Sequence, residues 1–371
     1  MSASAVQRKH YILGIESSCD ETAAAVVDAG MVVRSSVVAS QYDLHAEYGG
    51  VVPEIASRAH LERILPVVRK ALDEAGVSAG ELAAVAAGVR PGLIGSLLVG
   101  ASAAKGLAFA AMLPFYGVDH VAAHLFAGLL RGSDGEPSLE TAYPALGLVV
   151  SGGHTSLFRI DSPGACELIG RTIDDAVGEA FDKAAVMLGL GHPGGPNLER
   201  CARGGDPAAL AFPLPRLANP RDFSLSGLKT KLLYEIRGVP KGRGADASFS
   251  RDSGDLSDAR RRDLAASFQR AAISQVLDRL DACHELFRAR TLLVGGGVVA
   301  NEALREALAA WCAKRGCALV LPAHRYCVDN AAMIAGFAQL RRGAGDRGDP
   351  LSTPTEPVST LARGAAPRRV Q

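Results

Sequence analysis

The sequence predicts an α/β protein in which two similar lobes enclose a nucleotide cleft. A strand, a polar tip and a second strand follow one another twice, about 135 residues apart, which indicates a duplicated architecture. Elsewhere, short apolar runs end in glycine-rich turns that open helices, and α/β folds bind ligands at such strand–helix junctions. Two histidines four residues apart open one of these helices. Together these patterns predict one shared site between the lobes.

The two hairpins have the same design. In the first, the strand Tyr11-Ile-Leu-Gly-Ile15 is followed by the polar tip Glu16-Ser-Ser-Cys-Asp-Glu-Thr22 and by a second strand over residues 23–27. In the second, the strand Leu146-Gly-Leu-Val-Val150 is followed by the tip Ser151-Gly-Gly-His-Thr155 and by the strand Ser156-Leu-Phe-Arg-Ile160. Hydroxyl groups and backbone amides in such tips can bind a phosphate, although Asp20 and Glu21 could instead hold a cation beside it. A nucleotide between two facing phosphate hairpins is the arrangement of actin, sugar kinases and Hsp70, so a duplicated actin-like ATPase fold is predicted.

These patterns divide the chain into four parts. Residues 11–135 are predicted to form an N-terminal lobe with the first hairpin and the histidine pair. Residues 142–330 form a C-terminal lobe with the second hairpin, and a hinge spans residues 131–142. A last helix over residues 331–342 returns to the N-terminal lobe. Proline, glycine, serine, threonine and arginine dominate residues 343–371, which predicts a disordered tail.

His120 and His124 lie four residues apart, so both imidazoles can reach one point from one helix face. Such a pair supplies two ligands of a facial metal site and needs a third, hard ligand. Asp329, at a strand end in the other half of the sequence, is the candidate. Two ordinary histidines remain the alternative, but the strand–helix junction favours a site. A zincin peptidase is disfavoured because Val121, not glutamate, follows the first histidine.

Other patterns in the second half also suggest binding. Asp175, Glu179 and Asp182 would share one helix face, which costs stability unless cations or hydroxyl groups meet it; a solvated face is the alternative. The turn at Gly194-Gly-Pro opens a helix whose N-terminus could bind an anion or a hydroxyl group. Gly295-Gly-Gly before Asn301 suits a flat ring or ribose on bare backbone. It lacks the G-x-G-x-x-G pattern, so a dinucleotide site is disfavoured.

The composition limits the possible partners. The 371 residues include 40 Lys+Arg and 39 Asp+Glu, a net charge of +1, so nucleic-acid binding would need a local patch or a partner protein. The seven cysteines are scattered and odd in number, which favours a reducing cytoplasm over a disulfide framework. No signal-peptide core or membrane-length apolar run is present, which predicts a soluble cytoplasmic protein with no membrane partner.

Nine motifs in order resemble one family, the tRNA N6-adenosine threonylcarbamoyltransferases in their bacterial form, over about residues 11–342. They are Gly14-Ile-Glu-Ser-Ser-Cys-Asp-Glu-Thr22, Tyr48-Gly-Gly-Val-Val-Pro-Glu54, His120-x-x-x-His124, Ser151-Gly-Gly-His-Thr155, residues 174–183, Gly194-Gly-Pro196, Ser226-Gly-Leu-Lys-Thr230, residues 295–301 and Asp329-Asn330. The resemblance implies an enzyme of the actin-like fold that holds threonylcarbamoyl-AMP. Its threonylcarbamoyl group would pass to N6 of the adenosine just 3′ of the anticodon, in tRNAs that read codons beginning with A.

The resemblance also implies site residues. His120, His124 and Asp329 resemble ligands of one divalent metal ion, iron (Fe²⁺) by resemblance, with zinc also fitting the ligand types. By the same resemblance, the loop that binds the phosphate of the adenylate consists of Val149, Val150, Ser151, Gly152 and Gly153. The residues that resemble adenosine and ribose contacts are Asp182, Gly195, Glu199 and Asn301. The family also works with a smaller paralogous subunit, a P-loop ATPase subunit and a separate enzyme that makes the adenylate.

Several points stay open from the sequence. The general base is unassigned, with Asp20, Glu21 and His154 as candidates. The chain departs from the family pattern at Asp119, where a histidine is usual, and at Arg90 before Pro91-Gly92; the stretch 238–260 and the basic tail are extra. The alternative functions are a small-molecule kinase or ATPase of the same fold, which would need Mg²⁺ and ATP rather than a His₂Asp site, and a non-catalytic scaffold.

Overall fold

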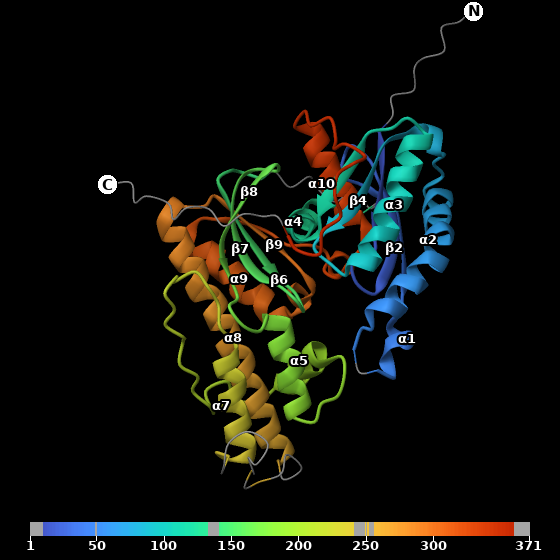
Figure 1. Cartoon of the computed structure of the whole chain (residues 1–371). Coiled ribbons are helices and arrows are strands. Elements are labelled where there is room, and N and C mark those ends of the chain that lie inside the picture. Colours follow the sequence, from blue (N-terminus) through green and yellow to red (C-terminus); the bar gives the residue numbers. More distant parts are fainter. Residues whose placement is uncertain are drawn as a thin grey trace, which may run out of the picture.

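The structure, a computed structural model, describes residues 10–48, 50–132, 141–240, 249, 251 and 256–359. Ten strands form two five-stranded sheets in this part of the chain, one in each half of the sequence (Figure 1). The first sheet contains β1 (Tyr11–Glu16), β2 (Glu21–Val27), β3 (Val33–Ser40), β4 (Leu82–Arg90) and β5 (Phe115–Asp119). The second contains β6 (Ala145–Val150), β7 (Thr155–Ser162), β8 (Ala165–Arg171), β9 (Thr291–Gly295) and β10 (Ala318–Val320).

The two sheets have the same topology. The strand orders are β3-β2-β1-β4-β5 and, read from its other edge, β8-β7-β6-β9-β10. In each sheet the first three strands in sequence pair antiparallel, and the last two continue in parallel beside the first strand. The duplication that the two hairpins predict is therefore confirmed.

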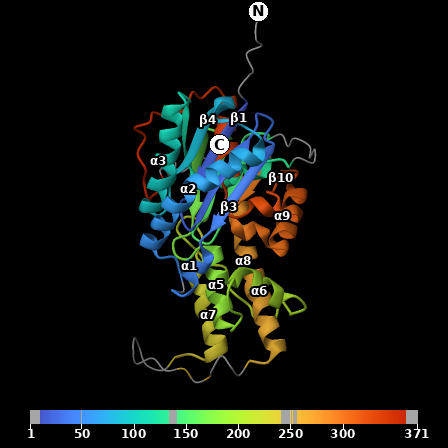
Figure 2. The same cartoon turned by 90° about the vertical axis from the view of Figure 1, so that its right-hand side faces the viewer.

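Helices cover the sheets in layers. The helices of the first half are α1 (Tyr42–Ala46), α2 (Pro53–Ala75), α3 (Ile94–Ala110) and α4 (His120–Phe126). Those of the second half are α5 (Val177–Met187), α6 (Gly194–Ala202), α7 (Ser226–Arg237), α8 (Asp258–Phe287), α9 (Glu302–Arg315) and α10 (Ala331–Gly343), with short 3₁₀ turns at Ala79–Glu81, Ala127–Leu129, Gly297–Ala300 and His324–Tyr326. Helix α2 lies across β2 and β3 on the outer face of the first sheet, as the second view shows (Figure 2).

A middle layer made of α4 and α10 lies between the two sheets (Figure 1). One hydrophobic core joins side chains of both helices to inward side chains of both sheets, among them Ile12, Phe158 and Leu293. Helix α10 packs directly on β1, because a Cβ added to Gly14 would lie 2.7 Å from the backbone nitrogen of Ala335. The last helix thus returns to the first sheet and carries the residues before it to the middle of the molecule.

The predicted disordered tail is partly wrong. Residues 344–359 follow an ordered path and form hydrogen bonds to the first lobe; for example, the N–H of Asp349 donates to the carbonyl of Phe115. The remaining tail, residues 360–371, lies outside the described residues, as do 133–140 of the predicted hinge and most of the stretch 238–260. The seven cysteines are not joined in disulfides. Within the described residues, no helix combines the length and hydropathy that crossing a membrane requires.

Candidate active site

The histidine pair is held by the middle layer. Strand β5 ends at Asp119, whose Oδ1 accepts hydrogen bonds from the backbone N–H groups of Val121 (3.0 Å) and Ala122 (3.2 Å) and so caps α4. His120 is the first residue of this helix and His124 lies one turn later; both are buried. The sequence prediction of two imidazoles on one helix face is confirmed.

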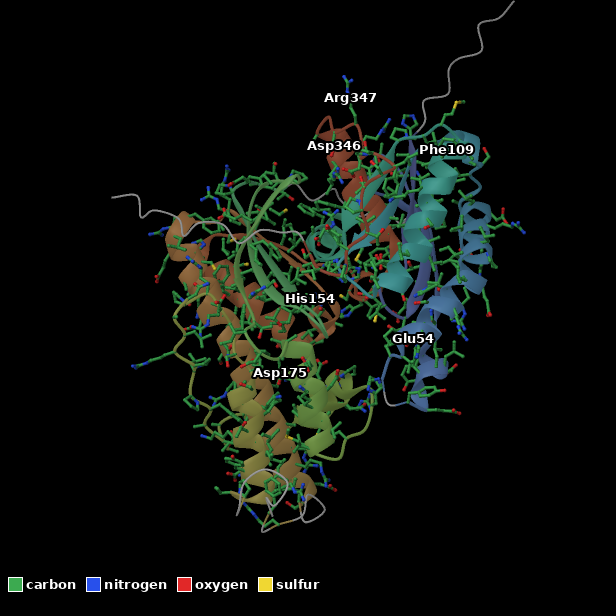
Figure 3. All side chains as sticks on the ribbon, viewed as in Figure 1. Glu54, Phe109, His154, Asp175, Asp346 and Arg347 are labelled. Carbon is green, nitrogen blue, oxygen red and sulfur yellow. The ribbon has the colours of Figure 1, made fainter. Side chains whose placement is uncertain are left out.

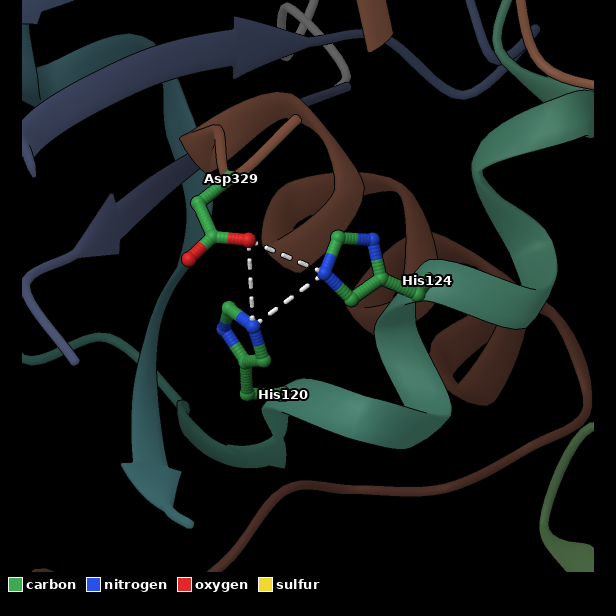
Figure 4. Close-up of side chains that lie close together, drawn as sticks. All are labelled: His120, His124 and Asp329. Carbon is green, nitrogen blue, oxygen red and sulfur yellow. Dashed lines mark hydrogen bonds and ion pairs between the residues drawn. The ribbon is translucent and has the colours of Figure 1, made fainter. Parts of the chain in front are cut away.

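Asp329 reaches the same point from the other half of the sequence. The strand end expected for Asp329 is wrong, because β10 ends at Val320 and Asp329 lies between the 3₁₀ turn His324–Tyr326 and α10. Asn330 caps the first turn of α10 (3.0 Å to the N–H of Met333). The three side chains point toward one another across the middle layer (Figure 4).

The geometry of the three side chains suits a metal ion. The His124 Nε2 atom lies 3.1 Å from His120 Nε2 and 3.1 Å from Asp329 Oδ1, and His120 Nε2 lies 3.4 Å from the same oxygen. Bonds of about 2.0–2.2 Å at angles of about 90–110° would set ligand atoms about 2.8–3.6 Å apart. Two imidazoles and one carboxylate are also the donor set of facial metal sites. The residues present therefore fit a divalent ion.

Charge at the cluster follows from burial and the facing groups. Burial opposes protonation of His120, but the carboxylates of Asp329 and Glu16 outweigh it and raise the pKa of His120 well above its usual range. Burial, with the neighbouring His120 charge, lowers the pKa of His124. Burial disfavours the Asp329 carboxylate, but the His120 charge outweighs it and holds its pKa well below the usual range. A metal ion bound here would displace the proton of His120 and keep the ionised Asp329 carboxylate as its hard ligand.

The sequence analysis missed the group that orients His120. Glu16, at the end of β1, is 1% exposed, and its Oε2 lies 3.2 Å from His120 Nδ1. Its Oε1 accepts a hydrogen bond from the backbone N–H of Ser18 (2.6 Å), and the Ser18 hydroxyl lies 3.2 Å from the same Nδ1. A carboxylate behind a ligating histidine is a common second layer of metal sites. The available signal was a glutamate at the first position of the polar tip, directly after an apolar strand.

The three candidate bases lie in the two hairpin tips. Burial, then Asp20 and Asp329, raises the pKa of Glu21 to about 8. Burial, then the charges of His120 and His124, lowers the pKa of His154 to about 4. His154 lies on the side of the second lobe that faces the first lobe (Figure 3). At neutral pH the His154 imidazole is therefore neutral, whereas the Glu21 carboxyl is mostly protonated.

The second hairpin offers an open tip. Val149 and Val150 of the predicted phosphate loop are buried in β6. A ligand could therefore reach only the tip residues of that loop, from Ser151 to Gly153. The Ser151 hydroxyl accepts a hydrogen bond from the N–H of His154 (3.0 Å) and closes the turn. A Cβ on Gly152 or Gly153 would meet nothing within 4 Å, so a ligand can approach their backbone amides.

The structure brings the predicted adenosine contacts together around one cavity of about 180 Å³. Its lining includes Gly152, Asp182, Gly195, Glu199, Asn301 and the turn Gly297–Ala300. Several of these side chains already have protein partners. Asp182 accepts from the N–H of Gly195 (3.0 Å), and Glu199 accepts from the N–H of Glu302 (2.9 Å) at the start of α9.

Asn301 has a structural task as well. It is 7% exposed, and its side chain caps α9 through the N–H of Leu304 (2.9 Å) and donates to Gln269 (2.9 Å). Asn301 therefore fixes the glycine turn that forms one wall of the cavity, in addition to facing it.

The acidic face around Asp175 is balanced by cations. The helix begins at Val177, so Asp175 precedes it and forms ion pairs with Lys183 (2.8 Å) and Lys229. Glu179 also pairs with Lys183 (2.7 Å). These ion pairs tie α5 to α7, so part of the acidic pattern has a structural explanation.

Comparisons with known proteins show the family of this chain. The family model of TsaD, tRNA N6-adenosine threonylcarbamoyltransferase, matches residues 32–336. A curated relative of that name from Symbiobacterium thermophilum is 51% identical over 91% of this chain and 93% of its own length. Another, from Trichlorobacter lovleyi, is 48% identical over 95% of this chain and 98% of its own length. These names do not favour the alternative of a small-molecule kinase or ATPase.

Solved structures agree on the fold. HypF of T. kodakarensis matches with a TM-score of 0.58 and 15% identity, over 91% of this chain and 48% of that chain. At this identity the likeness concerns the fold, and it confirms the actin-like ATPase class. The sequence motifs, the matching family model and the close relatives lead to one conclusion: the chain belongs to the TsaD family, the tRNA N6-adenosine threonylcarbamoyltransferases.

Proposed function

We propose that this chain transfers the threonylcarbamoyl group of threonylcarbamoyl-AMP to N6 of the adenosine just 3′ of the anticodon, in tRNAs that read codons beginning with A. The observation that supports this most is the convergence of His120, His124 and Asp329 beside both polar hairpin tips, in a chain of the TsaD family. A site with three protein ligands leaves positions open for substrate oxygens, as in catalytic metal sites.

His120, His124 and Asp329 would hold one divalent ion, which we assign as Fe²⁺, with Zn²⁺ as the alternative that the ligands also accept. When bound, the ion supplies Lewis acidity toward oxygens of the acyl adenylate. Glu16 would hold the ring of His120 so that Nε2 faces the ion, because its carboxylate lies 3.2 Å from Nδ1.

The remaining substrate contacts follow from the second lobe. The backbone amides around Ser151, Gly152 and Gly153 would bind the phosphate of the adenylate, following Val149 and Val150 at the end of β6. The adenosine and its ribose would occupy the cavity lined by Asp182, Gly195, Glu199 and Asn301. In this arrangement the phosphate would lie next to the adenosine, because Gly152 also lines that cavity. The AMP group is already a good leaving group, so no covalent enzyme intermediate is needed.

We assign His154 as the base that removes the proton of the attacking amine. The amine becomes strongly acidic as it attacks, so a weak but deprotonated base suffices. The imidazole of His154 is neutral at pH 7 because its pKa is lowered to about 4, whereas Glu21, with a pKa of about 8, is mostly protonated.

The rate of transfer should therefore be level across neutral pH. A base acts only when deprotonated, so His154 would give no change in single-turnover rate between about pH 6 and pH 8. If Glu21 were the base, the rate would rise about tenfold per pH unit up to its pKa, because its deprotonated fraction rises in that way. Single-turnover transfer measured across this range decides between them; a rise through pH 8 would refute the assignment of His154.

The partners that we propose are tRNA, threonylcarbamoyl-AMP, a smaller paralogous subunit and a P-loop ATPase subunit, in the cytoplasm. The net charge of +1 supports the need for partners, because a chain without an overall positive field binds tRNA weakly.

Reconstitution tests the function directly. The purified chain, supplied with these partners, threonine, bicarbonate, ATP and an enzyme that makes the adenylate, should convert the target adenosine of a tRNA reading an A-starting codon. The readout is mass spectrometry of the digested nucleosides. A tRNA with a different base at the target position should remain unmodified. Absence of the product with every component active would refute the proposal.

A further inference from the structure

After α10 the chain turns back along the first lobe as a C-terminal strap, residues 344–359. The N–H of Asp349 donates to the carbonyl of Phe115 (2.7 Å), and the N–H of Gly117 donates to the Asp349 carboxylate (2.8 Å). Lys105 donates to the carbonyl of Thr353 (2.5 Å). Strand β5 is an edge of the first sheet, so the strap covers backbone groups of that edge.

The strap continues to the carboxyl ends of β4 and β5, where the candidate site lies. The N–H of Glu356 donates to the carbonyl of Val89 (2.9 Å), and the N–H of Gly92 donates to the carbonyl of Pro357 (3.3 Å). These backbone contacts fix the strap against the glycine-rich turn that follows β4.

Both side chains that depart from the family pattern meet this strap. The Nε atom of Arg90 lies 3.3 Å from Oε2 of Glu356. The hydroxyl of Ser359 donates to Oδ2 of Asp119 (2.6 Å). Arg90 had no explanation from the sequence, and the contact with Glu356 supplies one.

Asp119 connects the strap to the metal cluster. Its Oδ2 accepts from Ser359, while its Oδ1 accepts from the N–H groups of Val121 and Ala122 in the first turn of α4. One carboxylate thus holds both the strap and the start of the helix that carries His120. A fixed rotamer of Asp119 supports that first turn, of which His120 is the first residue.

The strap also forms one wall of a cavity of about 220 Å³ next to the site. Pro357, Val358 and Ser359 line it together with Val121 of α4 and the candidate base His154. A displacement of the strap would therefore open the space between α4 and the second hairpin.

We propose that the C-terminal strap is a positioning device for the metal centre, in which Ser359 holds Asp119 and Glu356 holds Arg90. Ser359 is a positioning residue that acts through Asp119 on His120. The inference rests on the metal site proposed above, and it predicts that the strap changes metal affinity as well as stability.

The test measures Co²⁺ affinity of the purified full chain by chelator competition. Removing the hydroxyl in Ser359→Ala should weaken Co²⁺ binding about 3–10-fold, less than the loss of a direct partner of a ligating histidine. Ser359→Thr keeps the donor and should bind within about twofold of the wild type. A merely structural role would lower the melting temperature and leave the affinity for Co²⁺ unchanged, and that result would overturn the proposal.

Two deletions separate the strap from the rest of the tail. Removing residues 360–371 should leave Co²⁺ affinity unchanged, whereas removing residues 356–371 should weaken it at least as much as Ser359→Ala. If both deletions weakened Co²⁺ binding equally, the effect would come from residues 360–371 and not from the strap, and the assignment would be overturned. If the wild-type chain failed to bind Co²⁺, the metal site itself would be wrong. A wild type that binds, with unchanged affinity in Ser359→Ala, would refute the strap alone.

Discussion

The variant His124→Ala should lose bound metal and tRNA modification together while it keeps a cooperative melting transition. The substitution removes one of three ligand atoms that lie within 4.8 Å of one another, so metal affinity should fall by about 100-fold or more. The fold should survive, because three large hydrophobic clusters form the core and a chain of this size does not depend on a metal for folding. Metal content, thermal melting and transfer of the threonylcarbamoyl group are the three measurements.

His10→Ala is the matched control. This histidine is exposed and precedes β1 at the end of the strand opposite to Glu16, so its removal should change none of the three readouts. Wild-type transfer by metal-free His124→Ala would exclude the His₂Asp centre from the reaction.

The second large effect is expected for Glu16→Gln. The substitution keeps the size of the side chain but replaces the carboxylate that faces His120 Nδ1 at 3.2 Å by a neutral amide. Partners of ligating histidines typically contribute about 10–100-fold to metal affinity, and a loss in this range is expected here. The measurement is Co²⁺ affinity by chelator competition, with melting recorded in parallel.

Glu62→Gln is the matched control. Glu62 lies on the exposed face of α2, so this substitution makes the same chemical change away from the cluster. Equal Co²⁺ affinities for Glu16→Gln and Glu62→Gln would show that Glu16 does not support the metal centre.

Patterns that are local in the sequence were predicted well. Four-residue spacing places His120 and His124 on one helix face, because the pitch of a helix fixes this relation without tertiary contacts. The repeated order of strand, polar tip and strand predicted the duplicated sheets in the same way. Asp329 does join the cluster, but the strand-end position expected for it is wrong, because β10 ends at Val320 and a 3₁₀ turn lies between that strand and Asp329.

Other features depend on contacts between distant segments. No spacing shows that Glu16 faces His120, because that contact requires β1 to pair with β4, and β4 with β5, in the first sheet. The lysines that meet Asp175 come from α5 and from the separate helix α7. The side chain of Asn301 caps α9 and donates to Gln269, and the glycine turn alone indicated neither contact.

The fold class, the family and the histidine pair could all be predicted from the sequence: the first from the repeated hairpin, the second from the ordered motifs and the third from a four-residue spacing. Which charged groups surround the pair, and where residues 344–359 run, depends on contacts between distant segments. The residues after α10 have the composition of a disordered tail, yet 344–359 are held by backbone hydrogen bonds to the edge of the first sheet. That edge exists only once distant strands have paired, which is why composition could not predict the strap or its contact with Asp119.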